Sequence, residues 1–249
     1  MEAVEYHHDH TKSQGKQKPS DTNGTVHLEV RSQLGARSDA SAWRLSLREK
    51  TVRRLNRQRA PEHRLHFRQQ TSLARDMLEG LQQLFPAGFQ VSVLVDSWDA
   101  ANGILQCGRR QGWHVIGALT SNRKLDDKQR SQWPQALRHQ RYQRVQLTAT
   151  DQRSRTSLVR ARRGKLSKVP FEVWVLISQR HHRDHHPKYF LCTARSLTAQ
   201  PILPIYPKRW PIEVDNFYVK QPLGLANFWV QSYEATEKWF AIVLLVLTR

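Results

Sequence analysis

Alternating apolar and polar residues predict two strands near the start of the chain. The alternation covers "TVHLEV" (25–30) and "AWRLSLR" (42–48), and a period of two is typical of half-buried strands. The rest of residues 1–40 is polar and small. We therefore predict a disordered or poorly ordered arm over 1–40 with one weak strand, followed by a large domain over residues 41–249.

A different pattern begins after residue 70. In "TSLARDMLEGLQQLF" (71–85) apolar residues recur at helical spacing, and "FQVSVLVDS" (89–97) is an apolar strand. A further helix is predicted in "DAANGILQCGRRQG" (99–112) and a strand in "WHVIGALTS" (113–121). Strand, helix and strand in this order predict parallel pairing and an α/β fold class.

Short strands separated by turns follow over residues 138–193. They predict an antiparallel β segment inserted into the α/β core. The final third is helical in pattern, at 209–221 and again at 232–249. Its apolar run "WFAIVLLVL" (239–247) is too short to span a bilayer, so we predict a buried helix and no membrane insertion.

The charge of the chain points to a polyanionic partner. Its 249 residues include 40 Lys and Arg against 21 Asp and Glu, a net charge of +19. Nucleic acid is the first candidate and an anionic membrane surface the second. The basic residues are densest at 41–75 and 138–168, either as a solvated face or as phosphate contacts. The chain has only 2 cysteines, which excludes a disulfide framework and fits a reducing cytosol.

Two carboxylates stand out as candidate ligands. Asp96 directly follows an apolar strand, where it could hold a divalent metal or cap the next helix. Glu213 shares a helical stripe with Tyr206, Arg209 and Lys220. That stripe indicates either a metal or phosphate site, or a plain surface ladder of i, i+4 pairs.

A histidine-rich stretch, "QRHHRDHHPKYF" (179–190), offers another possible metal site. His181, His182, His185 and His186 could bind Zn²⁺ or Ni²⁺. The simpler interpretation is a polar turn between two strands.

Three motifs together resemble a known family. The spacing Y-x2-R-x3-E-x6-K in "YPKRWPIEVDNFYVK" (206–220) resembles the signature around the last acidic residue of DDE-superfamily insertion-sequence transposases. "VLVDSW" (93–98) resembles the strand that carries their second Asp, and "RRQGWHVIGALTSNRKL" (109–125) the strand and loop that follow. The resemblance runs from about Trp43 to the C-terminus.

The resemblance implies a ribonuclease-H-like mixed sheet with helices and an inserted antiparallel β segment. It also implies Mg²⁺-dependent DNA cleavage and strand transfer at insertion-sequence ends. In this family three carboxylates hold two Mg²⁺ ions, which activate the attacking oxygen and stabilise the leaving one. Mg²⁺ prefers carboxylate oxygens to His or Cys, in keeping with the few cysteines.

By the same resemblance, specific residues acquire roles. Asp96 corresponds to the second catalytic acid and Glu213 to the third, both as metal ligands. The expected DNA contacts are Tyr206, Arg209, Lys220, Arg123 and Lys124. The family also implies DNA as partner, a possible homodimer that holds two DNA ends, and a bacterial, nucleoid-associated location in the cytoplasm.

The chain departs from the family pattern in two respects. No acidic residue upstream of Asp96 ends a strong apolar strand, so we expect the strand with the first Asp to have been lost before Met1. Pro201, Pro204 and Pro207 lie where the family has a helix, and we expect them to interrupt it. These features predict a truncated, catalytically impaired transposase. The alternative is a non-catalytic, basic nucleic-acid-binding protein.

Overall fold

The structure is a computed structural model. It describes residues 5–8, 21–24, 26–34, 37–85, 88–97, 100–120, 123–148, 154–184, 186–194, 199–210, 212–214 and 233–247. The chain divides into two compact units. The first contains Met1–Met77 and Pro211–Arg249, and the second contains Leu78–Trp210.

Two antiparallel strand pairs belong to the first unit. β1 (Glu5–His8) pairs with β2 (Asp21–Gly24), and β3 (Val26–Leu34) pairs with β4 (Arg37–Ser46). The predicted strands at 25–30 and 42–48 are therefore confirmed as β3 and β4. Residues 1–40, where we predicted a poorly ordered arm, contribute β1, β2, β3 and the start of β4 to the described residues.

The helices directly after β4 follow the expected apolar spacing. α1 (Glu49–Asn56) buries Thr51, Val52 and Leu55, and a short 3-10 turn η1 (Pro61–His63) comes after it. α2 (Gln70–Leu81) continues into the 3-10 turn η2 (Gln82–Leu84), so the helix predicted over 71–85 is confirmed. The basic run of α1 lies on its exposed side, where Arg53 bonds Glu49 at 2.6 Å.

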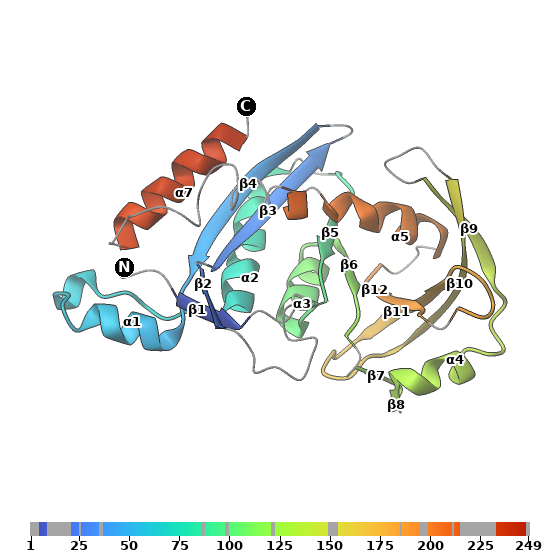
Figure 1. Ribbon diagram of the computed structural model, residues 1–249. Helices are drawn as coiled ribbons and strands as arrows, with labels where there is room; N and C mark the ends of the chain where they lie inside the picture. Colours follow the sequence, from blue (N-terminus) through green and yellow to red (C-terminus); the bar gives the residue numbers. More distant parts are fainter. Residues whose placement is uncertain are drawn as a thin grey trace. The chain divides into compact units, whose positions relative to one another are not determined.

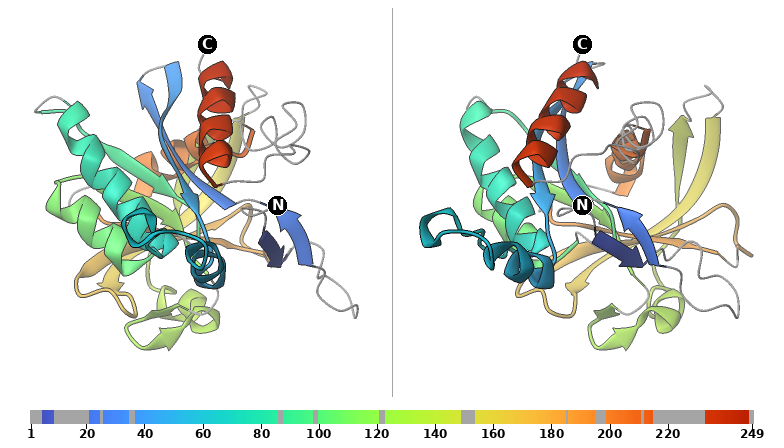
Figure 2. Two further views of the ribbon diagram at one scale, coloured as in Figure 1. Left: turned by 90° about the vertical axis from the view of Figure 1, so that its left-hand side faces the viewer. Right: turned by 60° about the vertical axis from the view of Figure 1, so that its left-hand side comes forward.

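The last helix, α7 (Tyr233–Leu247), corrects one expectation. We predicted a buried helix, yet Ile242 is 54% and Leu245 61% exposed, while Val243 is buried. β4 packs beside this helix (Figure 2). No helix among the described residues is long and apolar enough to cross a membrane.

A six-stranded sheet forms the centre of the second unit (Figure 1). Its strands, in spatial order, are β5 (Ser92–Val95), β6 (His114–Ala118), β12 (Lys188–Cys192), β11 (Glu172–Gln179), β10 (Ser154–Lys165) and β9 (Gln143–Thr148). β5 and β6 are parallel and are joined by α3 (Asn102–Arg110), which confirms the predicted strand–helix–strand unit. The other neighbours are antiparallel.

The strands predicted over 138–193 continue the core sheet. Their antiparallel order is as predicted, and β12 pairs directly with β6 through Cys192 opposite Ile116. The sheet is therefore mixed, with one parallel pair at its β5 end. This mixed sheet with helices agrees with the predicted α/β, ribonuclease-H-like class.

Helices cover both faces of the sheet. On one face, Ile202 and Leu203 of α5 (Ala199–Ile205) pack in the core cluster with Ile116 and Phe190. On the other face, α3 packs on β6, where Gly108 lies against Val115. Because neighbouring residues of a strand point to opposite faces, Ile116 and Val115 place α5 and α3 on opposite sides.

Two glycines of α3 should respond oppositely to alanine. A Cβ at Gly108 would overlap a methyl group of Val115, so Gly108→Ala is expected to destabilise the protein by about 1–3 kcal/mol. Gly103 has nothing within 4 Å of such a Cβ. Gly103→Ala should therefore stabilise by up to about 1 kcal/mol, the difference in helix propensity. Urea unfolding of both variants measures this, and equal changes would contradict the packing described.

A short helix and a hairpin cover the sheet beyond α3. α4 (Trp133–Ala136) buries Trp133 completely. The hairpin β7 (Lys124–Leu125) and β8 (Lys128–Gln129) turns at Asp126 and Asp127, both with positive φ of 46° and 63°. The indole N–H of Trp133 donates to the carbonyl of Lys128 at 2.8 Å. This bond ties the hairpin to the helix.

Both cysteines are buried thiols. Burial raises the pKa of the Cys192 thiol to about 11, partly offset by the N–H of Ala194. A thiol that stays protonated at neutral pH is a poor nucleophile. Cys192 packs in the core cluster of the second unit.

Candidate active site

Asp96 lies at the carboxyl end of β5, one residue after Val95. Its side chain is half-buried. The alternative role as a helix cap is wrong, because α3 begins at Asn102 and its N-cap residue is Ala101. The parallel pair β5–β6 holds the strand end rigidly from behind, as expected for a functional position in an α/β sheet.

Tyr206 and Arg209 lie on a 3-10 turn, η4 (Tyr206–Arg209), that packs next to β5. The Tyr206 ring meets the Phe190 ring edge-on, with centroids 4.9 Å apart and an angle of 64° between planes. The guanidinium carbon of Arg209 is 5.7 Å from the centre of the Tyr206 ring, within cation–π range. The structure thus brings these two signature residues beside the strand that leads to Asp96.

The prolines change the helix type and do not break the helical path. We expected Pro201, Pro204 and Pro207 to interrupt the helix, but Pro204 lies inside α5 and Pro207 inside η4. The path tightens from α to 3-10 geometry at Tyr206, and Trp210 is again helical. Since a 3-10 turn is compatible with a proline in its first positions, the chain reaches Trp210 without a gap.

Arg123 and Lys124 differ in what their side chains do. The guanidinium of Arg123 donates to the carbonyl of Ala100 at 2.7 Å and to that of Ser167 at 3.0 Å. Burial lowers the pKa of this guanidinium. Arg123 therefore ties the loop after β5 to the loop after β10, a positioning role in addition to any contact with DNA. Lys124 is exposed; its backbone N–H donates to Ser167 Oγ at 3.2 Å, and its carbonyl accepts the N–H of Ser167 at 2.8 Å.

The structure describes Glu213 but not Lys220. Glu213 is exposed and lies in the helical stretch 212–214 of the first unit. Lys220 lies outside the described residues. Tyr206 and Arg209 therefore lie beside β5, the strand that ends just before Asp96, and all three residues belong to the second unit. The pairing of Asp96 with Glu213 stays a prediction.

The carboxylate oxygens at these positions are ligands that suit a hard cation. Among the described residues, no group of three or more His, Cys, Asp or Glu is gathered for a metal. Mg²⁺ does not need such a cage, since it is usually held by one or two carboxylates together with waters and substrate phosphates. Asp96, a half-buried carboxylate at a strand end, fits that requirement.

The histidine-rich stretch forms a turn between β11 and β12. His181, His182 and His186 are exposed, and His185 lies outside the described residues. The turn is organised by Asp184, which accepts the backbone N–H groups of Arg180 and His186 at 2.9 and 3.0 Å. This arrangement agrees with the simpler interpretation of a polar turn.

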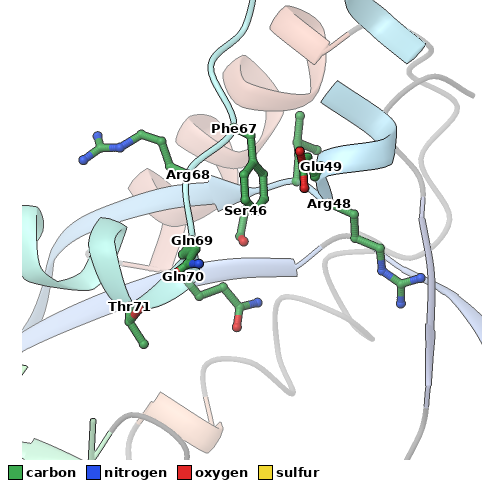
Figure 3. A pocket seen from close by; sticks show the side chains of 9 residues that line it. Ser46, Arg48, Glu49, Phe67, Arg68, Gln69, Gln70 and Thr71 are labelled. Atoms are coloured by element: carbon green, nitrogen blue, oxygen red, sulfur yellow. The ribbon is translucent and has the colours of Figure 1, made fainter. Parts of the chain in front are cut away.

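A pocket of about 460 Å³ in the first unit does not involve the predicted residues (Figure 3). It lies between the start of α1 and the start of α2, and the ring of Phe67 points toward Ser46. Its charged groups have partners outside it, because Glu49 pairs with Arg53 and Arg68 with Asp76. We assign no chemistry to this pocket.

Sequence reasoning missed the residues that support the site. The Phe190 ring packs against the Tyr206 ring, and the carbonyls of Ser167 and Ala100 accept hydrogen bonds from the Arg123 guanidinium. These contacts join segments that are far apart in the chain, so the spacing of residues within one segment cannot predict them. The sequence "KYFLCT" (188–193) around Phe190 predicted only a short strand.

Comparison with known protein families gives a match over most of the chain. The family described as "Transposase DDE domain" matches residues 68–249, a region that includes β5, η4 and Glu213. The match covers most of the chain, so the protein belongs to the transposase DDE domain family. No curated protein matches the chain. Membership gives a transposase-type function, with DNA as the partner and a divalent metal as the usual cofactor of the family.

Proposed function

We propose that the protein cleaves DNA at insertion-sequence ends and joins the released strand to new DNA, using Mg²⁺ held by Asp96 and Glu213. The observation that carries this proposal is the packing of η4, with Tyr206 and Arg209, beside the strand that ends at Asp96. Two separate parts of the Y-R-E-K and "VLVDSW" resemblance meet there. The pairing of Asp96 with Glu213 rests on the sequence signature.

Each residue has a distinct task in this proposal. Asp96 and Glu213 supply the carboxylate oxygens for the metal, and bound Mg²⁺ provides Lewis-acid stabilisation of the oxygens at the reacting phosphate. Arg209, held over the Tyr206 ring, and Lys220 neutralise phosphates of the DNA end. Lys124 makes a further phosphate contact, and Arg123 fixes the loop from which Lys124 projects.

We also propose that cleavage is slow. A two-metal mechanism uses a third carboxylate, and we assign no residue of this chain to that role. With a looser hold on the metals, less charge is stabilised in the transition state. The family resemblance further suggests a dimer that holds two DNA ends. Sedimentation with and without DNA measures that state.

The test is a nicking assay with purified full-length chain and DNA that carries the sequences flanking its reading frame. We expect slow, Mg²⁺-dependent nicks near the element ends that disappear with a chelator and in Asp96→Asn. DNA that is bound but never cut, or cut equally by Asp96→Asn, would overturn the proposal in favour of a binding protein.

A further inference from the structure

Three segments of the second unit meet in a stack of rings and a guanidinium. The guanidinium carbon of Arg160, in β10, lies 3.9 Å from the centre of the Tyr142 ring, just before β9. The ring of His182, in the turn after β11, meets Tyr142 edge-on at 4.8 Å and 83°. The Tyr142 hydroxyl donates to Gln179 Oε1 at 2.9 Å. The stack fixes the turn and the entry to β9 side by side (Figure 1).

The turn itself is held by one buried carboxylate. The Asp184 side chain is 4% exposed and accepts the N–H groups of Arg180 and His186, and also Arg180 Nε at 3.3 Å. The backbone bond from Arg180 contributes most to holding the pKa of Asp184 well below its usual range. The Asp184 carboxylate therefore accepts hydrogen bonds within the turn, whereas the basic side chains of Arg180, His181, His182 and Arg183 are exposed.

Exposed cations gather around this stack. Asp184 is the one acidic residue within 138–144 and 178–188. The exposed basic side chains there include Arg138, Arg141, Arg180, His181, His182 and Arg183. We call residues 138–142, Arg160 and 180–184 the arginine–histidine rim.

The rim is separate from Asp96. Strand register aligns Val95 with Gly117, Leu191, Val175 and Arg162 in successive strands. Four strand spacings therefore lie between β5 and β10, roughly 19 Å at about 4.8 Å each. Arg160 is two residues from Arg162, so it projects from the same face as Val95. Asp96 directly follows Val95, so it lies at the β5 end of the sheet.

We propose that the arginine–histidine rim binds the phosphodiester backbone of duplex DNA, as a contact separate from the metal-binding carboxylates. This rests on the proposed function only in taking DNA as the substrate. Arginine forks suit phosphate oxygens, and stacking on Tyr142 orients Arg160 before DNA arrives. Contacts to phosphates carry no sequence information, so we expect the rim to contact the backbone regardless of sequence.

The test is a binding titration of the full-length chain against labelled duplexes, followed by fluorescence anisotropy over a range of salt. Arg141 and Arg183 are both exposed, so Arg141→Gln combined with Arg183→Gln should not disturb folding. We expect affinity to fall on the order of tenfold and the salt slope to decrease by about two, equally for unrelated sequences. Arg110→Gln is the control, because Arg110 already pairs with Glu79 at 2.9 Å, and it should change little.

A second variant tests the ordered turn. Asp184→Ala adds one net positive charge, so charge alone predicts tighter binding. Because Asp184 fixes the turn, we expect weaker binding instead. Tighter binding by Asp184→Ala would overturn the role of the ordered turn.

The outcomes separate this inference from the proposed function. If the double arginine variant binds like the wild type with the same salt slope, the rim is not a DNA contact, whatever Asp96 does. If that variant binds weakly but no form of the chain cuts DNA, the rim stands and the cleavage proposal fails. At saturating DNA, the double variant is expected to cleave at the wild-type rate.

Discussion

Replacing Glu213 by Gln is expected to reduce Mg²⁺-dependent DNA cleavage on the order of a thousandfold, and Asp96→Asn should do the same. Each change keeps the shape of the side chain and removes the anion that holds a hard cation. Metal ions stabilise several kcal/mol of transition-state charge, and each 1.36 kcal/mol is a factor of about ten in rate. The rate of cleavage at saturating DNA measures the effect, and affinity without metal should stay unchanged.

The double variant of Asp96 and Glu213 makes this prediction stricter. If both carboxylates hold the same metal, the double variant should lose little more than either single variant, because groups that act as a unit are not additive. Losses that multiply would show two independent roles. Glu172→Gln is a suitable control, since Glu172 is an exposed carboxylate on β11, 3.9 Å from Arg163.

Truncating Trp133 to Ala is expected to destabilise the second unit by about 3–5 kcal/mol. Trp133 is fully buried and packs edge-on against Tyr189 at 5.5 Å, so its removal leaves a cavity between α4 and the sheet. It also removes the bond to the Lys128 carbonyl. Urea unfolding followed by circular dichroism measures the change in free energy of unfolding.

A second substitution separates packing from hydrogen bonding at Trp133. Trp133→Phe keeps most of the apolar volume and loses the indole N–H, so it should cost only about 1 kcal/mol. Hydrogen exchange in that variant should increase mainly in the β7–β8 hairpin. If Phe costs as much as Ala, the bond to Lys128 dominates and the packing argument is wrong.

Local periodicity was enough to predict much of the second unit. The apolar run at 89–97 and the one at 113–121 became β5 and β6, parallel and joined by α3. In the first unit, the spacing of Leu73 and Met77 predicted the start of α2. In each case the buried residues recur at the period of one element, so the pattern within a dozen residues carries the information.

Contacts between distant segments were beyond the reach of that reasoning. Nothing local in "KYFLCT" (188–193) indicates that β12 pairs with β6, which makes the β segment part of the core sheet. Pro207 locally disfavours an α-helix, yet the packing of Tyr206 on Phe190 keeps the chain helical in 3-10 form. For α7, the hydrophobicity of the sequence predicted a buried helix. The exposure of Ile242 and Leu245 depends instead on which elements pack against the helix.

The candidate site divides in the same way. The apolar strand in the sequence was enough to predict that Asp96 follows β5. Its alternative role as a helix cap could be rejected only from the observed start of α3. For Arg123, the sequence indicated only a cation near the sheet. Its bonds to the carbonyls of Ala100 and Ser167 depend on two loops meeting in space.

The most direct test of a shared metal is iron-mediated cleavage of the polypeptide. Fe²⁺ in place of Mg²⁺, with ascorbate and peroxide, generates radicals that cut the backbone beside the bound ion. A single ion held by both carboxylates should produce cuts near residue 96 and near residue 213, and both should vanish in Asp96→Asn and in Glu213→Gln. Cuts near only one of these positions, or cuts near 213 that persist in Asp96→Asn, would contradict a shared site.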